Sequence, residues 1–371
     1  MTQTPKYRLC EVCIGRQGGG QGDFEVVPSG GCFICGGLMG RLDEIAEGAW
    51  RKAKRYEFAT FGVGVSMPEG VQEREDEIRS VLQLKGKRTI KAQLSAMLSA
   101  GLAEKSRKKQ DRMNPDLTVL VDAGEPQITL QSRPLFYFGR YTKPEGVAQR
   151  KELCRTCWGK GCESCGQTGF DQSPSVEEKV GRKLVEATGA RGAKFTWIGS
   201  EDVDSVVRGN GRPFVVELKS PRARGVPKRF VAGGKGGRVG VMRGRVLPSK
   251  PTKLPTFKFR TRISATAEKK LDRTEVRGLA KAFRNATVVF DRPNERPVSK
   301  MVYGVRGSVR GRRLLLEAEI DGGLPIKRFV SGERVTPSVS EVLKTEVKCD
   351  KFDICGVKET GEFGFGKVSR I

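Results

Sequence analysis

Two aspartates, Asp202 and Asp204, lie in a polar segment between an aromatic strand end and a Gly-Asn-Gly sequence that predicts a tight turn. Carboxylates in a turn beside a strand end occupy a place where protein scaffolds present catalytic groups, although many such turns are only solvated. Residues 218–267 contain fourteen Lys and Arg and no carboxylate. A small acidic cluster beside so basic a stretch indicates chemistry on a polyanion.

The composition narrows the classes of chemistry that the chain can perform. It has 69 Lys and Arg against 43 Asp and Glu, a net charge of +26, which favours a nucleic acid or an anionic surface as partner. Histidine is absent. This excludes Ser-His and Cys-His nucleophile systems and imidazole metal ligands. Catalysis must therefore use carboxylates, Lys, Tyr, Cys or a bound metal.

Eight of the ten cysteines form Cys-x-x-Cys pairs in two sets. The sets are Cys10, Cys13, Cys32 and Cys35, and Cys154, Cys157, Cys162 and Cys165. Four thiolates at such spacings predict one structural zinc ion for each set, with redox dithiols or disulfides as the alternatives. We expect no organic or small-molecule cofactor.

Periodicity and composition divide the 371 residues into three parts. Residues 1–40 are predicted to form a zinc module, and residues 41–132 a compact α/β domain. Residues 133–371 are predicted to form an α+β domain on a mostly antiparallel sheet, with a four-cysteine insertion at 150–170. The Gly- and Arg-rich residues 222–255 are predicted to be a flexible basic insertion, because they offer little apolar surface to bury.

Regular elements are expected within these parts. Helices are predicted over residues 38–56, 71–84, 90–105, 274–283 and 339–344, and from a capping box at Ser175 and Glu178 to Glu186. Strands are predicted over residues 58–65, 117–121, 127–131, 257–263, 287–290, 314–320 and 352–357. No run of about 18 apolar residues occurs and the first ten residues are polar, so we expect neither a membrane span nor a secretory signal. We also expect the protein to be cytoplasmic and monomeric.

Several motifs, in this order, resemble the archaeal and eukaryotic tRNA pseudouridine synthase family with an N-terminal zinc-bearing, THUMP-type domain. They are the paired N-terminal Cys-x-x-Cys, RPLFYFGRYTK, CRTCWGKGCESCGQTG, SVEE, GSEDVDSVVRGNGRPFVVELKSPR and LPIKRFVSGERVTPSVSEVL. The resemblance covers nearly the whole chain. It implies a THUMP-like domain over 41–132, a pseudouridine synthase domain over 133–371, and action on uridines 54 and 55 of the tRNA T-arm.

The resemblance also implies roles for residues of this chain. Asp202 matches the catalytic aspartate, and Ser200 stands where the family has Arg. Phe259, followed by Arg260, matches the aromatic residue that stacks on the target base, usually Tyr in the family. Lys327 matches the basic residue that pairs with the catalytic carboxylate. On its sequence alone, Lys327 would be a solvated lysine at a strand edge.

Pseudouridine formation sets demands that these residues can meet. The target base must leave the stack before its glycosidic bond can be broken, and a carboxylate can act on the sugar as nucleophile or base. We expect an ionised Asp202 and a stacking Phe259. We expect the basic stretch 218–267, Arg140 and Lys143 to contact RNA phosphates. Asp204, Arg208 and Arg212 are candidates to support the site, although Arg212 could pack beneath the turn, and Arg260 is a further candidate for RNA contact. Binding to the T-arm and elbow of tRNA should weaken steeply with salt.

Two other classes of protein remain alternatives. A metal-dependent nuclease could use Asp204 with Glu217 and Lys219, because two carboxylates can hold Mg²⁺ while a lysine assists water attack. A non-catalytic zinc-ribbon protein that binds tRNA would explain the charge and the cysteines without any reaction. Chelation separates the first alternative from a synthase, and a pseudouridine assay separates the second.

Overall fold

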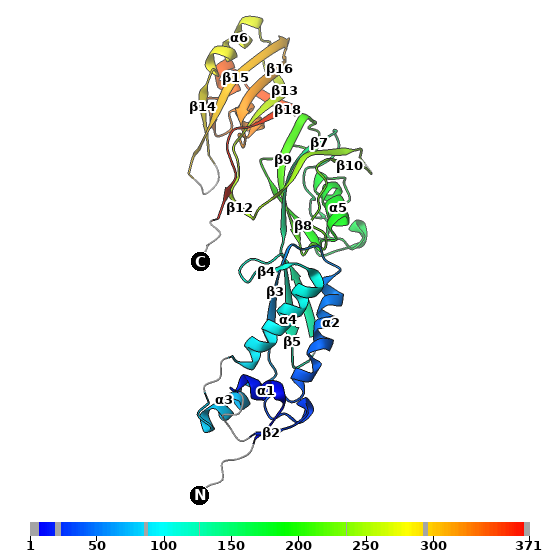
Figure 1. Cartoon of the computed structure of the whole chain (residues 1–371). Helices are drawn as coiled ribbons and strands as arrows, with labels where there is room; N and C mark the ends of the chain where they lie inside the picture. The colour runs from blue at the N-terminus through cyan, green and yellow to red at the C-terminus, as the bar shows by residue number, and fades with distance from the viewer. Residues whose placement is uncertain are drawn as a thin grey trace. The chain divides into compact units, whose positions relative to one another are not determined.

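The computed structural model describes residues 7–18, 24–84, 88–125, 127–234, 236–291 and 296–366. The chain forms two compact units, shown in Figure 1. The N-terminal unit comprises Met1–Pro134 and Lys219–Arg224, and the C-terminal unit comprises Leu135–Leu218 and Gly225–Ile371. Both units combine helices with sheets, which confirms the predicted α+β class.

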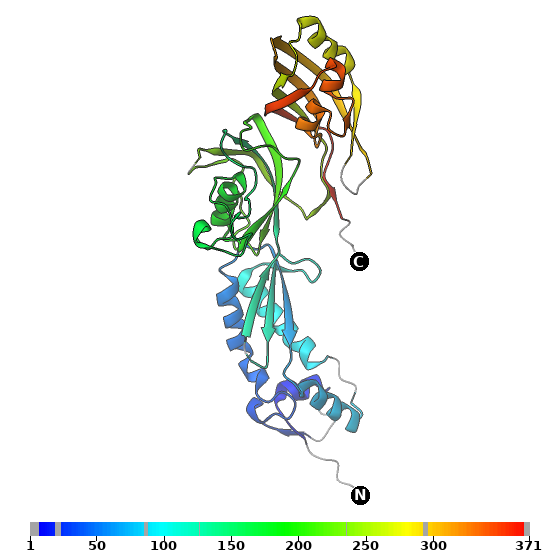
Figure 2. The same ribbon diagram turned by 180° about the vertical axis from the view of Figure 1, so that it is seen from behind.

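The N-terminal unit is a small sheet covered by helices. Its elements are β1 (Tyr7–Leu9), α1 (Glu11–Arg16), β2 (Phe24–Val26), η1 (Ser29–Gly31), η2 (Leu38–Arg41), α2 (Leu42–Ala53), β3 (Thr60–Ser66), α3 (Val71–Val81), α4 (Ile90–Ser106), β4 (Lys109–Gln110), β5 (Leu117–Asp122) and β6 (Gln127–Ser132). The larger sheet has the order β4-β3-β5-β6. Helices α2 and α4 pack on one face of it, and Figure 2 shows its other face.

Helix α4 follows directly from its sequence. The Thr89 side chain accepts a hydrogen bond from the amide of Ala92, which satisfies one of the free donors at the helix start. Ile90, Leu94 and Leu98 recur every four residues, and all three are buried against the unit's core. This stripe is what fixes the helix on the sheet, because apolar burial supplies most helix stability in proteins.

The cysteine-bearing start of the chain shares its core with the rest of the N-terminal unit. One continuous cluster joins Leu9 and Ile34 to sheet residues such as Phe61. A buried ion pair between Arg16 and Glu75, 2.6 Å long, fastens α1 to α3. A module of 40 residues has too little apolar surface for a core of its own, which explains the sharing.

The C-terminal unit is built on one long sheet. Its elements are β7 (Leu135–Lys143), η3 (Glu163–Cys165), α5 (Val176–Thr188), β8 (Gly192–Trp197), β9 (Val207–Lys219), β10 (Phe230–Ala232), β11 (Val239–Leu247), β12 (Pro251–Lys253), β13 (Phe257–Ala267), α6 (Arg273–Ala282), β14 (Ala286–Phe290), β15 (Val298–Arg310), β16 (Arg313–Asp321), α7 (Ile326–Ser331), β17 (Val335–Thr336), α8 (Val339–Leu343), β18 (Val347–Glu359) and β19 (Gly364–Phe365).

The strand order of this sheet is β10-β11-β7-β9-β18-β13-β16-β15-β14-β17, with β8 paired to β9. All neighbours along this path are antiparallel except β9 and β18, in agreement with the prediction of a mostly antiparallel sheet. Strands β9 and β18 meet through one parallel pair, Val207 and Ile354. The residues just before Val207 therefore lie where the two halves of the sheet join.

The basic residues 222–255 are more ordered than the sequence predicts. They contain β10, β11 and β12, and β11 pairs along β7. Val239, Val241 and Leu247 of β11 are buried in the core of the unit, where helix α5 also packs. The prediction of a flexible insertion is corrected here, because a neighbouring strand supplies the backbone partners and apolar contacts that the segment lacks by itself.

The Gly-Asn-Gly sequence is also different from the expected tight turn. Gly209 and Gly211 have left-handed φ angles of 63° and 74°, but both lie inside β9. Asn210 between them accepts a hydrogen bond from the amide of Val357 (2.8 Å) and donates one to its carbonyl oxygen (2.5 Å). Its amide side chain thus imitates a backbone group, so the glycines form an irregularity in a strand rather than its end.

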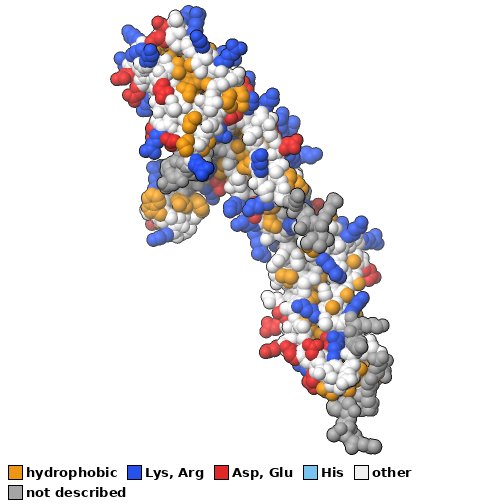
Figure 3. All heavy atoms as spheres, turned by 90° about the vertical axis from the view of Figure 1, so that its left-hand side faces the viewer, with side chains coloured by type: hydrophobic (Ala, Val, Ile, Leu, Met, Phe, Trp, Pro, Cys, Tyr) orange, Lys and Arg blue, Asp and Glu red, His pale blue; other side chains and the backbone are white. Residues whose placement is uncertain are grey.

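The described helices include none that is both long enough and apolar enough to span a membrane. On the face in Figure 3, Lys and Arg side chains are spread widely over the C-terminal unit.

Candidate active site

The loop between β8 and β9 carries the two aspartates. Lys143 of β7 lies beneath this loop, and its ammonium donates hydrogen bonds to the carbonyl oxygens of Asp202 (3.1 Å), Val203 (3.2 Å) and Ser205. Lys143 is only 2% exposed, and burial lowers its pKa. The prediction that Lys143 contacts RNA phosphates is corrected, because its donors are already used by carbonyl groups inside the protein. Lys143 instead shapes the loop.

The Asp202 carboxylate forms an ion pair with the ammonium of Lys327, at 3.0 Å. Lys327 lies in the first turn of α7 rather than at a strand edge. The side chains of Asp202 and Lys327 are 41% and 54% exposed, so a ligand can reach both. The hydrogen bond to Asp202 raises the pKa of Lys327. The pairing expected from the resemblance is thus present in the structure.

A second, buried group of side chains also supports the loop between β8 and β9. Glu201, next to Asp202, accepts a hydrogen bond from the Tyr141 hydroxyl and lies 2.8 Å from Arg212. Burial first, and then the charge of Glu201, raises the pKa of Tyr141 well above its usual value, so the hydroxyl keeps the proton that it donates. Arg212 also donates to the carbonyl oxygen of Ile198 (3.0 Å). The loop is therefore anchored before and after its exposed aspartate.

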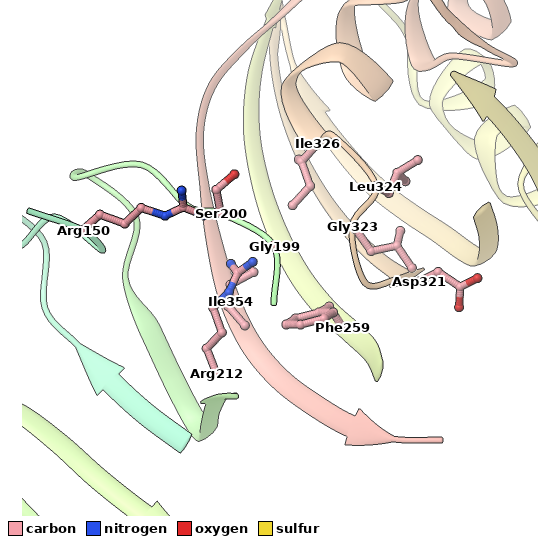
Figure 4. A pocket seen from close by; sticks show the side chains of 11 residues that line it. Arg150, Gly199, Ser200, Arg212, Phe259, Asp321, Gly323, Leu324, Ile326 and Ile354 are labelled. Atoms are coloured by element: carbon pink, nitrogen blue, oxygen red, sulfur yellow. The ribbon is translucent and has the colours of Figure 1, made fainter. Parts of the chain in front are cut away.

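Phe259 of β13 lies on the wall of a cavity of about 290 Å³, shown in Figure 4. The residue is 3% exposed, and the Arg212 guanidinium lies 5.2 Å from the centroid of its ring. Leu324 and Ile326 add apolar surface to the same cavity. Gly199 has a left-handed φ of 76°, and a Cβ atom there would collide with Arg212. An aromatic wall with apolar neighbours and a nearby cation suits a planar, polar ring.

A second cavity, of about 470 Å³, adjoins the first and contains Asp202, Asp204 and Lys327 in its lining. Arg150 and Ser200 line both cavities. Phe259 and the Asp202 carboxylate therefore line two cavities of the C-terminal unit that share Arg150 and Ser200. This is an arrangement in which one group can hold a base while the other acts on its sugar.

The remaining predicted RNA contacts are dispersed. Arg140 is 2% exposed and donates to the carbonyl oxygen of Val357 (2.9 Å), so its prediction as a phosphate contact is corrected. Arg208 is exposed on β9. Arg260 points to the opposite face of β13 from Phe259, because side chains alternate along a strand, and it lines a separate cavity.

The nuclease alternative has no support in this geometry. Glu217 lies ten residues beyond Val207 in β9, and an extended strand rises about 3.3 Å per residue, so about 30 Å of strand separates it from the Asp204 loop. Two carboxylates so far apart cannot share one Mg²⁺ ion. Among the described residues, the two four-cysteine sets are the groups whose ligand atoms converge closely enough to hold a metal.

Both cysteine sets converge as their spacing predicts. In each set the four sulfur atoms all lie within 4.8 Å of one another. Sulfur atoms are 3.8 Å apart for Cys10 and Cys35, for Cys154 and Cys162, and for Cys157 and Cys165. Zinc bound to four thiolates at about 2.3 Å in a tetrahedron requires sulfur separations of about 3.8 Å. The donor type, number and spacing therefore fit zinc.

Three residues that matter in this site were missed in the sequence, namely Tyr141, Glu201 and Arg150. Glu201 looked like one more acid of a solvated turn, and nothing local marks it as buried. Tyr141 stands in the aromatic and basic segment RPLFYFGRYTK, whose alternation is a strand signal that could have placed its side chain inside. Arg150 carries no signal before the cavities are known.

Two family models match the chain. The archaeal Pus10 THUMP domain model matches residues 45–122, and the Pus10 C-terminal model matches residues 136–233.

Similar proteins match over nearly the full length. The tRNA pseudouridine synthase Pus10 of Cenarchaeum symbiosum (strain A) is 34% identical over 365 residues, covering 94% of this chain and 89% of its own. The protein of the same name from Archaeoglobus fulgidus is 32% identical, covering 94% and 99%. Among solved structures, the archaeal box H/ACA sRNP Nop10-Cbf5 complex matches 62% of this chain and 50% of its own, with 11% identity and a TM-score of 0.32.

Proposed function

The chain belongs to the tRNA pseudouridine synthase Pus10 family, and from this premise we propose that it isomerises uridine to pseudouridine in the T-arm of tRNA. The target that the family resemblance implies is uridine 55, together with uridine 54. In this reaction the bond from N1 to C1′ breaks and a bond from C5 to C1′ forms. The C5 proton is lost and N1 gains a proton, so no redox partner or nucleotide cofactor is consumed.

Asp202 is the catalytic carboxylate of this proposal. It acts on the sugar of the extruded nucleotide, either by attacking C1′ or by removing a sugar proton. The observation that carries the proposal is its 3.0 Å ion pair with Lys327, because the ammonium holds the carboxylate in a defined position where a substrate can reach it. Both side chains remain accessible to a substrate in the second cavity.

Phe259 holds the extruded base in the first cavity. Stacking on an aromatic ring contributes about 1–3 kcal/mol per base, and Phe has the same stacking face as Tyr. The apolar side chains of Leu324 and Ile326 exclude water around the base while the glycosidic bond is broken.

The test is pseudouridine formation on an unmodified tRNA transcript, detected by carbodiimide-stop sequencing. The wild type should produce stops in the T-arm, and transcripts with cytidine at position 54 or 55 should identify the target. Asp202→Asn should reduce the rate at least about 10³-fold, since it removes the charge but little volume. The matched control is Asp291→Asn, an exposed carboxylate of the same unit that lines neither cavity. No T-arm signal from the wild type refutes the proposal and favours a tRNA-binding protein without activity.

We also propose that each cysteine set holds one structural zinc ion. Such a site can contribute about 10–16 kcal/mol of apparent binding free energy to ordering a short segment. Metal analysis should find two zinc ions per chain. Replacing Cys154 and Cys157 with Ser should remove one of them, whereas Cys355→Ser, outside both sets, should leave two. A wild type without zinc would overturn this assignment.

A further inference from the structure

Three cationic side chains line the two adjoining cavities, namely Arg150, Arg212 and Lys327. Two of them have charged partners. Arg212 pairs with Glu201 at 2.8 Å, and Lys327 pairs with Asp202 at 3.0 Å. Among the described residues, no hydrogen-bond acceptor or carboxylate partners the exposed guanidinium of Arg150. Arg150 is thus the cation of these cavities whose charge is still available to a ligand.

The backbone that carries Arg150 is nevertheless held in place. The preceding residue, Gln149, is buried and donates to the Tyr141 hydroxyl (3.0 Å) and to the carbonyl oxygen of Gly199 (3.3 Å). These bonds tie the segment to the loop that presents Asp202. The Arg150 side chain therefore starts from a fixed point beside the site, which lowers the entropy cost of binding.

Arg150 lies at the place where the two cavities meet. Arg150 and Ser200 are the residues common to both linings, and Figure 4 shows the guanidinium extending toward Ser200. Ser200 is neutral, so Arg150 supplies the charge at this point. A nucleotide with its base against Phe259 and its sugar at Asp202 has its phosphate next to the sugar. Without a cation, Asp202 and Asp204 would repel that phosphate.

We propose that Arg150 binds a phosphate of the extruded nucleotide, as a substrate-positioning residue. This inference rests on the proposed function, because the nucleotide is oriented by Phe259 and Asp202. A guanidinium binds a phosphate through two parallel hydrogen bonds, which fixes orientation as well as position. The interaction forms when the nucleotide leaves the stack, so it stabilises the extruded state over the stacked state.

The experiment compares Arg150→Gln with Arg150→Lys in single-turnover pseudouridine formation at saturating protein. Arg150→Gln should lower the rate about 10- to 100-fold, the range expected when a hydrogen bond between charged groups is removed. Arg150→Lys should recover part of this activity, because it restores the charge without the planar fork. The matched control is Arg191→Gln, an exposed arginine of the same unit that lines neither cavity, and its rate should equal the wild-type rate.

Two readouts separate this inference from a structural effect. The melting temperature of Arg150→Gln should equal that of the wild type, since the side chain has no partner within the described protein. The slope of log affinity for tRNA against log salt should fall by about 0.7, the amount for one phosphate on a single strand. An active wild type with an unaffected Arg150→Gln overturns the inference alone. A wild type that forms no pseudouridine overturns the proposed function and this inference with it.

Discussion

Glu201 and Arg212 form an ion pair of 2.8 Å whose side chains are 0% and 5% exposed. The interaction is electrostatic, because Glu201 Oε2 accepts no hydrogen bond among the described residues. The other oxygen of Glu201 accepts from Tyr141. Since Glu201 precedes Asp202 directly, this buried pair holds the backbone that presents the Asp202 carboxylate.

Replacing Glu201 with Gln should destabilise the C-terminal unit strongly. Gln can still accept from Tyr141, but Arg212 is left as an uncompensated buried charge. Breaking a buried ion pair in this way costs about 3–5 kcal/mol. Denaturant unfolding of the C-terminal unit measures the effect. Glu317→Gln, which breaks an exposed pair with Arg262 in the same unit, should cost less than about 1 kcal/mol. Equal effects of the two variants would show that the buried pair holds nothing in place.

Replacing Lys327 with Gln should separate activity from stability. The pair with Asp202 is half exposed, so removing it should change the free energy of unfolding by less than about 1 kcal/mol. The rate should nevertheless fall about 10²- to 10³-fold, because in the proposed mechanism this cation contacts the carboxylate that acts on the sugar. Lys183→Gln is the control, since it breaks a surface pair of similar exposure with Glu186, and neither residue lines the cavities. A large drop in stability in Lys327→Gln, or full activity, would contradict this prediction.

The ion pair between Asp202 and Lys327 also leads to a prediction about the pH dependence of the rate. The hydrogen bond to Asp202 raises the pKa of Lys327 above its ordinary 10.5. A lysine whose pKa is raised in the folded state contributes stability that is complete below the unfolded pKa and disappears as pH rises through the folded pKa. The Lys327 ammonium should therefore stay protonated from about pH 7 to about pH 10. The single-turnover rates of the wild type and of Lys327→Arg should therefore depend on pH in the same way over this range. An alkaline decline in the wild type that is absent from Lys327→Arg would contradict this prediction.

The parts of the fold that are determined by residues close together in the sequence could be predicted. Helix α4 was expected over residues 90–105 and occupies Ile90–Ser106, because its apolar stripe and its Thr89 cap are local signals. Strand β11 was missed for the opposite reason. Its Gly and Arg content is typical of a loop, and its order comes from pairing with β7, about a hundred residues earlier in the chain.

In the candidate site, too, some features could be predicted from nearby residues, and others depend on residues far away in the sequence. The acidic turn beside a basic stretch is visible in the sequence and made Asp202 and Asp204 candidates, and the family resemblance then favoured Asp202. The burial of Arg140 and Lys143 could not, because a basic residue in an aromatic strand is equally compatible with solvent and with a buried set of carbonyl partners. Whether such a cation faces RNA or the core depends on distant groups, such as Val357 for Arg140.

Replacing Lys143 with Met should damage the loop without weakening the binding of tRNA phosphates. It leaves the carbonyl oxygens of Asp202, Val203 and Ser205 without their donor, and each unsatisfied buried group costs about 1–3 kcal/mol. We expect stability to fall by about 2 kcal/mol or more and pseudouridine formation to slow. The slope of tRNA affinity against salt should stay at the wild-type value, because a buried ammonium releases no counterions from RNA.

The comparison variant for the salt slope is the double replacement of Lys228 and Arg229 with Met. Both residues are exposed within the basic stretch, and their stability contribution should be small. Each phosphate that is no longer neutralised should reduce the slope by about 0.7–0.9, while stability stays near the wild-type value. Filter binding at several salt concentrations gives the slopes of both variants. A reduced slope for Lys143→Met would place its ammonium on RNA and contradict its assignment as the support of the Asp202 loop.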